Sequence, residues 1–84
     1  ENAGVIFKTV EAAKNQTGKK TVQELKKWVT DTINRNPFLD VEYFEIVNFD
    51  NLMPVNDWKE KNGKIACIAV YCGKVRLIDN YLLN

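Results

Sequence analysis

Apolar residues in the first third of the chain recur at the spacing of an α-helix. The first stripe covers nearly three turns and predicts a helix with one buried face. Its members are Ala3, Ile6, Phe7, Val10 and Ala13. Asn15 to Gly18 follow, and we expect them to end this helix because polar residues and glycine favour a connector.

A second helix is predicted from Thr21 to Asn36. Thr21 and Glu24 have the spacing of a capping box, in which the threonine hydroxyl accepts from the Glu24 amide and the glutamate reaches back. The apolar stripe of this helix consists of Val22, Leu25, Val29 and Ile33, with Trp28 at its margin. Pro37 disfavours helical geometry in the residue before it, so the helix ends there. The two helices are therefore predicted to form an αα-hairpin.

After Pro37 the pattern changes to that of β-strands. Val41 to Phe49 is rich in aromatic and β-branched residues and predicts the first strand. Asn48 to Asn62 is rich in Asn, Asp and Pro, which indicates a long surface connection. Ile65 to Tyr71 is apolar on both faces, which predicts a central strand that is covered on both sides.

The last strand is predicted from Val75 to Leu82. Gly73-Lys74 precedes it and suits a two-residue hairpin turn of type II′, which favours glycine first. The expected fold class is therefore α+β, with a two-helix hairpin packed on a small, mainly antiparallel three-stranded sheet. The 84 residues suffice for one small domain, residues 1–84.

Composition and charge narrow the function classes. Hydrophobic content of 45% with 27% charged residues is typical of a globular domain. A net charge of +1 provides no strong field toward nucleic acid or an anionic membrane. No apolar run is long enough to span a bilayer, and no signal peptide precedes the first helical pattern. A cytoplasmic location is therefore expected. The chain begins at Glu1 without methionine, which suggests a piece of a longer polypeptide.

The two cysteines fit the same interpretation. Cys67 and Cys72 lie in one predicted strand, about 16 Å apart and on opposite faces. A disulfide requires Cα atoms within about 7 Å, so these two residues are not expected to bridge. With no histidine in the chain, a zinc site is not expected either.

Residues for a self-contained active site are missing. The chain has no histidine, which is the usual acid or base at neutral pH, and its four glycines form no phosphate-binding loop. Glu42 and Glu45 are expected on opposite faces of a strand, with structural or solvated roles. We therefore assign no catalytic, substrate-binding or metal-binding residue.

A cluster of lysines surrounds the connector between the helices. It consists of Lys14, Lys19, Lys20, Lys26 and Lys27. Such a cluster can meet phosphates, but a solvated helical face is the favoured interpretation at this net charge. Trp28 and Trp58 are expected to be packing residues rather than platforms for stacked bases.

The segment GKVRLIDN, residues 73–80, is unusual for a plain strand because charged residues flank its aliphatic centre. In a regular strand Arg76 and Asp79 point to opposite faces, so they are not expected to form an ion pair. Arg76 is suited to bind a carboxylate, a phosphate or a helix C-terminus. Asp79 and Asn80 are suited to cap backbone amides where the strand ends.

Two segments resemble the C-terminal domain of the pantothenate synthetases, or pantoate–β-alanine ligases. The first is YFEIVN.DNLMPV, from Tyr43 to Val55, with Leu52 and Pro54 at the family's spacing. The second is KIACIAVYCGKVRLIDN, from Lys64 to Asn80. The two helices match this family only by their pattern. The residues that carry the signature near the end of the chain are Gly73, Arg76, Leu77, Ile78, Asp79 and Asn80.

The resemblance implies an activity for a longer parent enzyme. Such enzymes use ATP and Mg²⁺ to adenylate pantoate, and β-alanine then attacks the pantoyl adenylate to give pantothenate, a step toward coenzyme A. The nucleotide and pantoate sites of the family belong to an N-terminal Rossmann-type domain. Its histidine-bearing phosphate motif and Lys-Met-Ser-like loop are absent from this chain.

The resemblance therefore implies that this chain is the C-terminal lid domain, inactive alone and without a cofactor of its own. Its expected partner is the N-terminal catalytic domain of the same polypeptide, with no nucleic acid and no membrane. Arg76, Asp79 and Asn80 are expected to hold the last turn of the sheet and the contact between domains. A small binding module for RNA or an acidic protein partner is the alternative. A self-sufficient enzyme is disfavoured by the missing histidine and phosphate loop.

Overall fold

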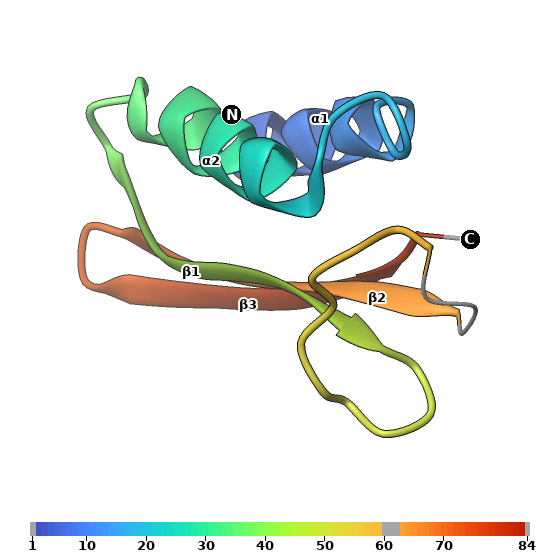
Figure 1. Cartoon of the computed structure of the whole chain (residues 1–84). Helices are drawn as coiled ribbons and strands as arrows, with labels where there is room; N and C mark the ends of the chain where they lie inside the picture. Colours follow the sequence, from blue (N-terminus) through green and yellow to red (C-terminus); the bar gives the residue numbers. More distant parts are fainter. Residues whose placement is uncertain (1, 60–62, 84) are drawn as a thin grey trace.

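The computed structural model describes residues 2–59 and 63–83, and the side chains from residue 4 onward within these ranges. The chain forms two layers, with a helical hairpin on one side of a three-stranded sheet (Figure 1). The elements in chain order are α1 (Asn2–Lys14), α2 (Val22–Asn34), β1 (Leu39–Asn48), β2 (Lys64–Cys72) and β3 (Val75–Leu82). The predicted α+β fold class is confirmed.

The second helix follows the sequence prediction closely. Thr21 is the N-cap of α2, and both hydrogen bonds of the capping box are present, at 3.1 Å from the Glu24 amide and 2.9 Å to the Glu24 carboxylate. The predicted stripe is buried against the sheet. It consists of Val22, Leu25, Val29 and Ile33. The helix ends at Asn34, just before Asn36-Pro37.

The first helix deviates from the prediction at one position. Ile6, Val10 and Ala13 are buried as expected, but Phe7 is 53% exposed. The buried face of α1 is rotated away from Phe7, because Thr9 is only 6% exposed and Val5 packs against the core. The Phe7 ring instead lies near Tyr81 of β3, with ring centroids 6.4 Å apart. The side chain of Ala3 lies outside the described residues.

The sheet is antiparallel, in the order β1-β2-β3. Strand β2 is central, as predicted, and pairs along its length with both neighbours. The turn at Gly73-Lys74 is confirmed, and only its first residue has positive φ (61°), as type II′ requires. Strand β1 contains a bulge between Val41 and Tyr43 that the sequence pattern did not reveal.

The core lies between the helices and one face of the sheet. Phe44, Ile46, Ile68 and Val70 contribute from the strands to this cluster. The prediction that β2 is covered on both faces is wrong for the described part of the chain, because both helices lie on one side (Figure 1). We call the uncovered side the open face. By register it carries Asp40, Tyr43, Glu45 and Val47 of β1, Ile65, Cys67, Ala69 and Tyr71 of β2, and Arg76, Ile78, Asn80 and Leu82 of β3.

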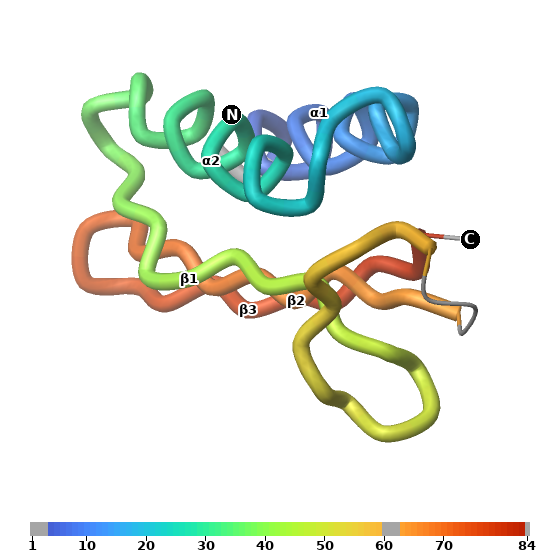
Figure 2. The backbone as a smooth tube through the Cα atoms, viewed as in Figure 1, coloured from blue at the N-terminus to red at the C-terminus, as the bar shows by residue number. Residues whose placement is uncertain are grey.

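The connection between β1 and β2 first leaves the sheet as a loop and then returns along β1 (Figure 2). Val55 is buried in the core, and its amide donates to the Ile46 carbonyl at 2.8 Å, so the connection is not entirely a surface segment. The Trp58 indole packs at the core margin and donates to the Lys20 carbonyl at 2.5 Å. Residues 60–62 of this connection lie outside the described ranges.

Within residues 2–59 and 63–83, no helix has the length and apolar character needed to cross a bilayer.

Candidate functional site

Strand β3, which carries most of the GKVRLIDN segment, forms one edge of the sheet. Because it pairs only with β2, its outer backbone groups face away from the sheet. The register puts Leu77 and Asp79 on the helix side, opposite Val70 and Ile68. Arg76 and Ile78 lie on the open face, opposite Tyr71 and Ala69. The segment therefore presents different chemistry on its two sides.

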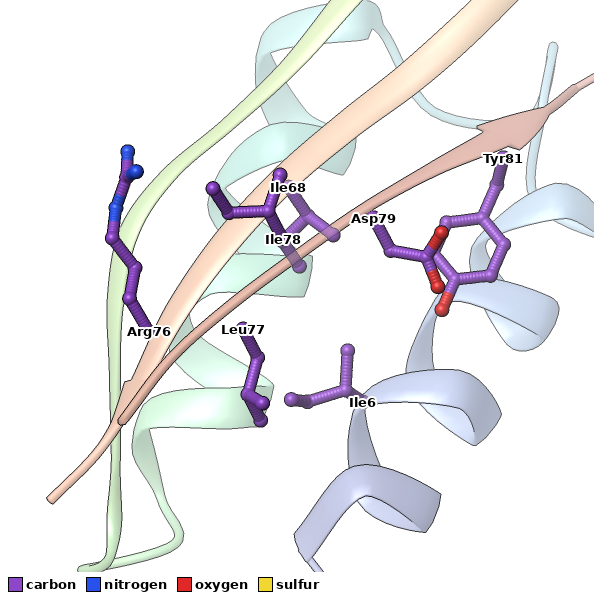
Figure 3. Close-up of a pocket in the computed structure, with 7 residues that line it drawn as sticks. All are labelled: Ile6, Ile68, Arg76, Leu77, Ile78, Asp79 and Tyr81. Carbon is purple, nitrogen blue, oxygen red and sulfur yellow. The ribbon is translucent and has the colours of Figure 1, made fainter. Parts of the chain in front are cut away.

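A groove of about 390 Å³ runs along this edge, between β3 and α1 (Figure 3). Ile6 of α1 and Leu77 of β3 point toward one another across it (Figure 3). The residues that line it are Ile6, Ile68, Arg76, Leu77, Ile78, Asp79 and Tyr81. The groove thus has an aliphatic centre and, at one end, the polar pair Asp79 and Tyr81.

The polar end of the groove is held by local hydrogen bonds. The Asp79 carboxylate accepts from the Asn80 amide at 2.8 Å. Because β3 continues to Leu82, this bond lies within the strand, and the expectation that Asp79 and Asn80 cap its end is wrong. Partial burial raises the pKa of the Tyr81 hydroxyl, and a hydrogen bond with Asp79 raises it further. At neutral pH the phenol is therefore a hydrogen-bond donor and not a base. This pair can orient a polar group, but it lacks a nucleophile matched to a general base.

Arg76 does not take part in that polar pair. Its guanidinium lies well apart from Asp79 and Tyr81 (Figure 3), and its Nε donates to Glu42 Oε1 at 2.6 Å. The hydrogen bond to Glu42 raises the pKa of Arg76, so the guanidinium stays charged. Of the three binding partners considered for Arg76, the structure provides a carboxylate, that of Glu42, and Arg76 and Asp79 lie on opposite faces as expected.

The position of Glu42 corrects the sequence analysis. Glu42 and Glu45 were expected on opposite faces of a regular strand, but the bulge at Glu42 shifts the register of β1. Glu42 therefore reaches Arg76 on the open face, where Glu45 also lies. Alternation alone could not reveal this pair, because the extra residue of a bulge moves the preceding side chains of the strand to the opposite face.

The lysine cluster is largely engaged within the chain. Lys14 pairs with Glu11 at 3.1 Å, and Lys26 with Glu45 at 2.7 Å. Lys27 pairs with Asp31 at 2.8 Å. Three of the five lysines thus already face carboxylates, which fits a solvated helical face. Trp28 and Trp58 both pack against the core, as predicted.

The two thiols lie on opposite faces of β2, as their spacing predicts. Cys72 packs against the core, whereas Cys67 belongs to the open face. Partial burial raises the pKa of the Cys67 thiol, with a smaller contribution from Glu45. A thiol in this state is a weak nucleophile at neutral pH.

Sequence reasoning missed the residues that complete the groove, Ile6, Ile68 and Tyr81. Their apolar spacing was visible, and it correctly predicted burial for Ile6. The pattern of one element cannot show which neighbour it faces. The sequence therefore could not predict that α1 and β3 leave a groove between them.

Comparison with known proteins extends this picture. The family model for pantoate-beta-alanine ligase matches residues 1–82. The chain is 44% identical over 80 residues to a pantothenate synthetase of Azobacteroides pseudotrichonymphae, covering 95% of this chain and 29% of the relative. A Bacteroides fragilis pantothenate synthetase is 42% identical over 80 residues, with coverages of 95% and 28%.

A solved structure has the same arrangement. The pantothenate synthetase of Thermus thermophilus superposes with a TM-score of 0.77 at 25% identity, over 94% of this chain and 28% of that protein. The chain thus spans less than a third of each of these longer proteins. With the family model matched over nearly its whole length, the chain belongs to the pantoate-beta-alanine ligase family.

Proposed function

We propose that this chain is the C-terminal lid domain of an enzyme that joins pantoate to β-alanine. The observation that supports this best is the family match over residues 1–82, combined with relatives more than three times as long. In this proposal a Rossmann-type domain of the same polypeptide precedes the chain. That domain binds ATP, Mg²⁺ and pantoate, and it carries the catalytic residues.

The residues of this chain favour a supporting role over a catalytic one. The chain contains no histidine, and the polar side chains that line the groove beside β3 are Asp79, Tyr81 and Arg76, of which Arg76 is already paired with Glu42. Among the residues that the structure describes, no three His, Cys, Asp or Glu side chains gather as a metal site would require. We therefore assign Mg²⁺ and ATP to the preceding domain and expect the isolated chain to be inactive.

A lid has a specific task in such a reaction. An acyl adenylate is a mixed anhydride that water can hydrolyse to free pantoate and AMP. A domain that closes over the cleft excludes water until the amine of β-alanine arrives. A small rigid domain with a moderate interdomain interface is suited to this motion. The cytoplasm, where such biosynthetic substrates are made, is the proposed location.

The decisive experiment compares the full-length ligase with a form that ends before Glu1. Both are given ATP, pantoate and β-alanine, and both AMP and pantothenate are measured. We expect truncation to lower pantothenate formation and to release AMP without a matching amount of pantothenate. Undiminished synthesis by the truncated enzyme would remove the lid role. No synthesis by a folded full-length enzyme would remove the ligase function itself.

The RNA-binding or acidic-partner alternative gains no support. Three of the five lysines that suggested it are paired with carboxylates of the same chain. The comparisons point to the ligase family throughout.

A further inference from the structure

The open face of the sheet is more apolar than a solvent-facing surface requires. Antiparallel sheets with one wet face normally alternate apolar and polar residues, but here β2 is apolar on both sides. On the open face Tyr43 is 36% exposed, Tyr71 37%, Ile78 55% and Leu82 56%. Ala69 lies between Tyr43 and Ile78 in register and is fully buried, although it is outside the main core.

A loop enlarges this surface. Residues 49–53, which we call the apolar loop, leave the end of β1 and project from the sheet on the side opposite the helices (Figure 1). Three of its five side chains are apolar and well exposed: Phe49 at 58%, Leu52 at 65% and Met53 at 59%. The loop and the open face thus form one continuous side of the molecule.

The apolar loop has a defined conformation. The Asn48 amide donates to the Met53 carbonyl and the Leu52 amide to the Asn48 carbonyl, both at 2.9 Å. The Asn51 side chain accepts from the Met53 amide at 2.9 Å. These bonds hold Leu52 at φ 59°, a left-handed conformation that costs a leucine about 1–2 kcal/mol. A strained turn that exposes apolar side chains is typical of a contact site and not of a passive connector.

We propose that the open face and the apolar loop together form the surface on which this domain docks against the preceding domain of the ligase. The inference rests on the proposed function, since it needs a longer parent. It explains why β2 has two apolar faces, because the helices cover one and the preceding domain covers the other. The relatives are long enough to supply this cover, since 71% or more of their length lies outside the match.

Two charge pairs on this surface are compatible with being covered. Arg76 is already paired with Glu42, and Glu45 with Lys26, so docking leaves neither pair without a partner. Paired charges cost less to desolvate than isolated ones. Contact through exposed aliphatic and aromatic side chains around such pairs matches the mixed polarity of interdomain interfaces.

The test measures thiol alkylation in the full-length ligase, resolved by peptide mass spectrometry. Leu52→Cys reports on the proposed surface. Phe38→Cys is the matched control, since Phe38 is 69% exposed and lies between α2 and β1, away from the apolar loop. Ile78→Cys provides a second probe on the sheet, and the native Cys67 reports without any substitution. Each variant is first checked for pantothenate synthesis, and each is labelled with and without ATP plus pantoate.

We expect ATP plus pantoate to slow alkylation of Leu52→Cys and Ile78→Cys by about tenfold, which corresponds to a closed population near 90%. Phe38→Cys should react at an unchanged rate.

Protection of both probes in all states supports permanent docking of the same surface. Equal rates for probe and control in an active enzyme would overturn the docking surface while leaving the ligase function intact. Protection that depends on protein concentration would instead identify a second copy as the occupant and overturn the proposal. A folded but inactive full-length enzyme would remove the proposed function, and this inference with it.

Discussion

Alanine at Gly73 tests how the hairpin at the start of the GKVRLIDN segment is held. A Cβ at this position meets nothing within 4 Å, so sterics with neighbouring atoms add no cost. The backbone conformation adds a cost, because φ is 61° and the left-handed region destabilises an L-residue by about 1–2 kcal/mol. Alanine also lowers the entropy of the unfolded chain, which stabilises the folded state by about 0.4–1 kcal/mol. The net expectation for Gly73→Ala is a loss of about 0.5–1.5 kcal/mol in unfolding free energy.

Gly4→Ala is the matched control, since it makes the same chemical change inside α1, where space around the new Cβ is also open. There alanine should raise the unfolding free energy by at most about 0.5–1 kcal/mol, the value for a helix interior, because Gly4 lies in the first turn. In a domain of this size about 1 kcal/mol shifts the melting temperature by roughly 4–8 °C, so the two variants should move in opposite directions. Urea unfolding and thermal melts of both variants measure the difference. Equal and small effects at the two glycines would refute the assigned turn.

Three further perturbations address the cross-strand pair, the core and the helix cap. Arg76→Met should lower the unfolding free energy only slightly at low salt, because both side chains of the pair are exposed. Adding Glu42→Gln to this variant should lower it little further, because the two residues form one pair. About 0.5 M NaCl should abolish the difference, and a salt-independent loss would show that Arg76 acts through packing instead. Ile68→Ala should cost about 2–5 kcal/mol, since Ile68 is 1% exposed in the core, and urea midpoints measure it. A loss below about 1 kcal/mol would mean that the cavity collapses. Thr21→Ala should cost about 1 kcal/mol by loss of the cap. Hydrogen bonds from the Thr21 amide and hydroxyl lower the pKa of Glu24 below its ordinary value of 4.5, so its stabilisation is present above that pH and is lost as pH falls through the folded-state value. Glu24→Gln should therefore differ from the parent at pH 7, and the difference should shrink as pH falls through the lowered pKa of Glu24. A difference that stays constant down to acid pH would refute the charge-assisted cap.

Much of the fold was predictable because its signals are local. The capping box at Thr21, the glycine turn at Gly73 and the stripe of α2 each depend on a few neighbouring residues, and each appears in the structure as predicted. The exposure of Phe7 and the pairing of Glu42 with Arg76 were not predictable. The first depends on where α1 sits relative to the sheet, and the second on a bulge that no local pattern marks.

In the candidate site, too, local features were predictable and tertiary contacts were not. The sequence placed Arg76 and Asp79 on opposite faces of one strand, and alternation was sufficient for that. The groove required Ile6 and Tyr81 from distant parts of the chain, and only the tertiary arrangement brings them together. Family resemblance identified the segment, but it said nothing of the space beside it.

The prediction about β2 failed in a way that carries information. A strand that is apolar on both faces is predicted to be covered on both, and the described residues cover only one. Local pattern and packing disagree here, and such conflicts are uncommon in a sequence that folds to a single state. In the docking proposed above, the preceding domain of the ligase supplies this missing cover. On that proposal the sequence prediction describes β2 in the docked domain, and the structure describes β2 in the 84-residue chain alone.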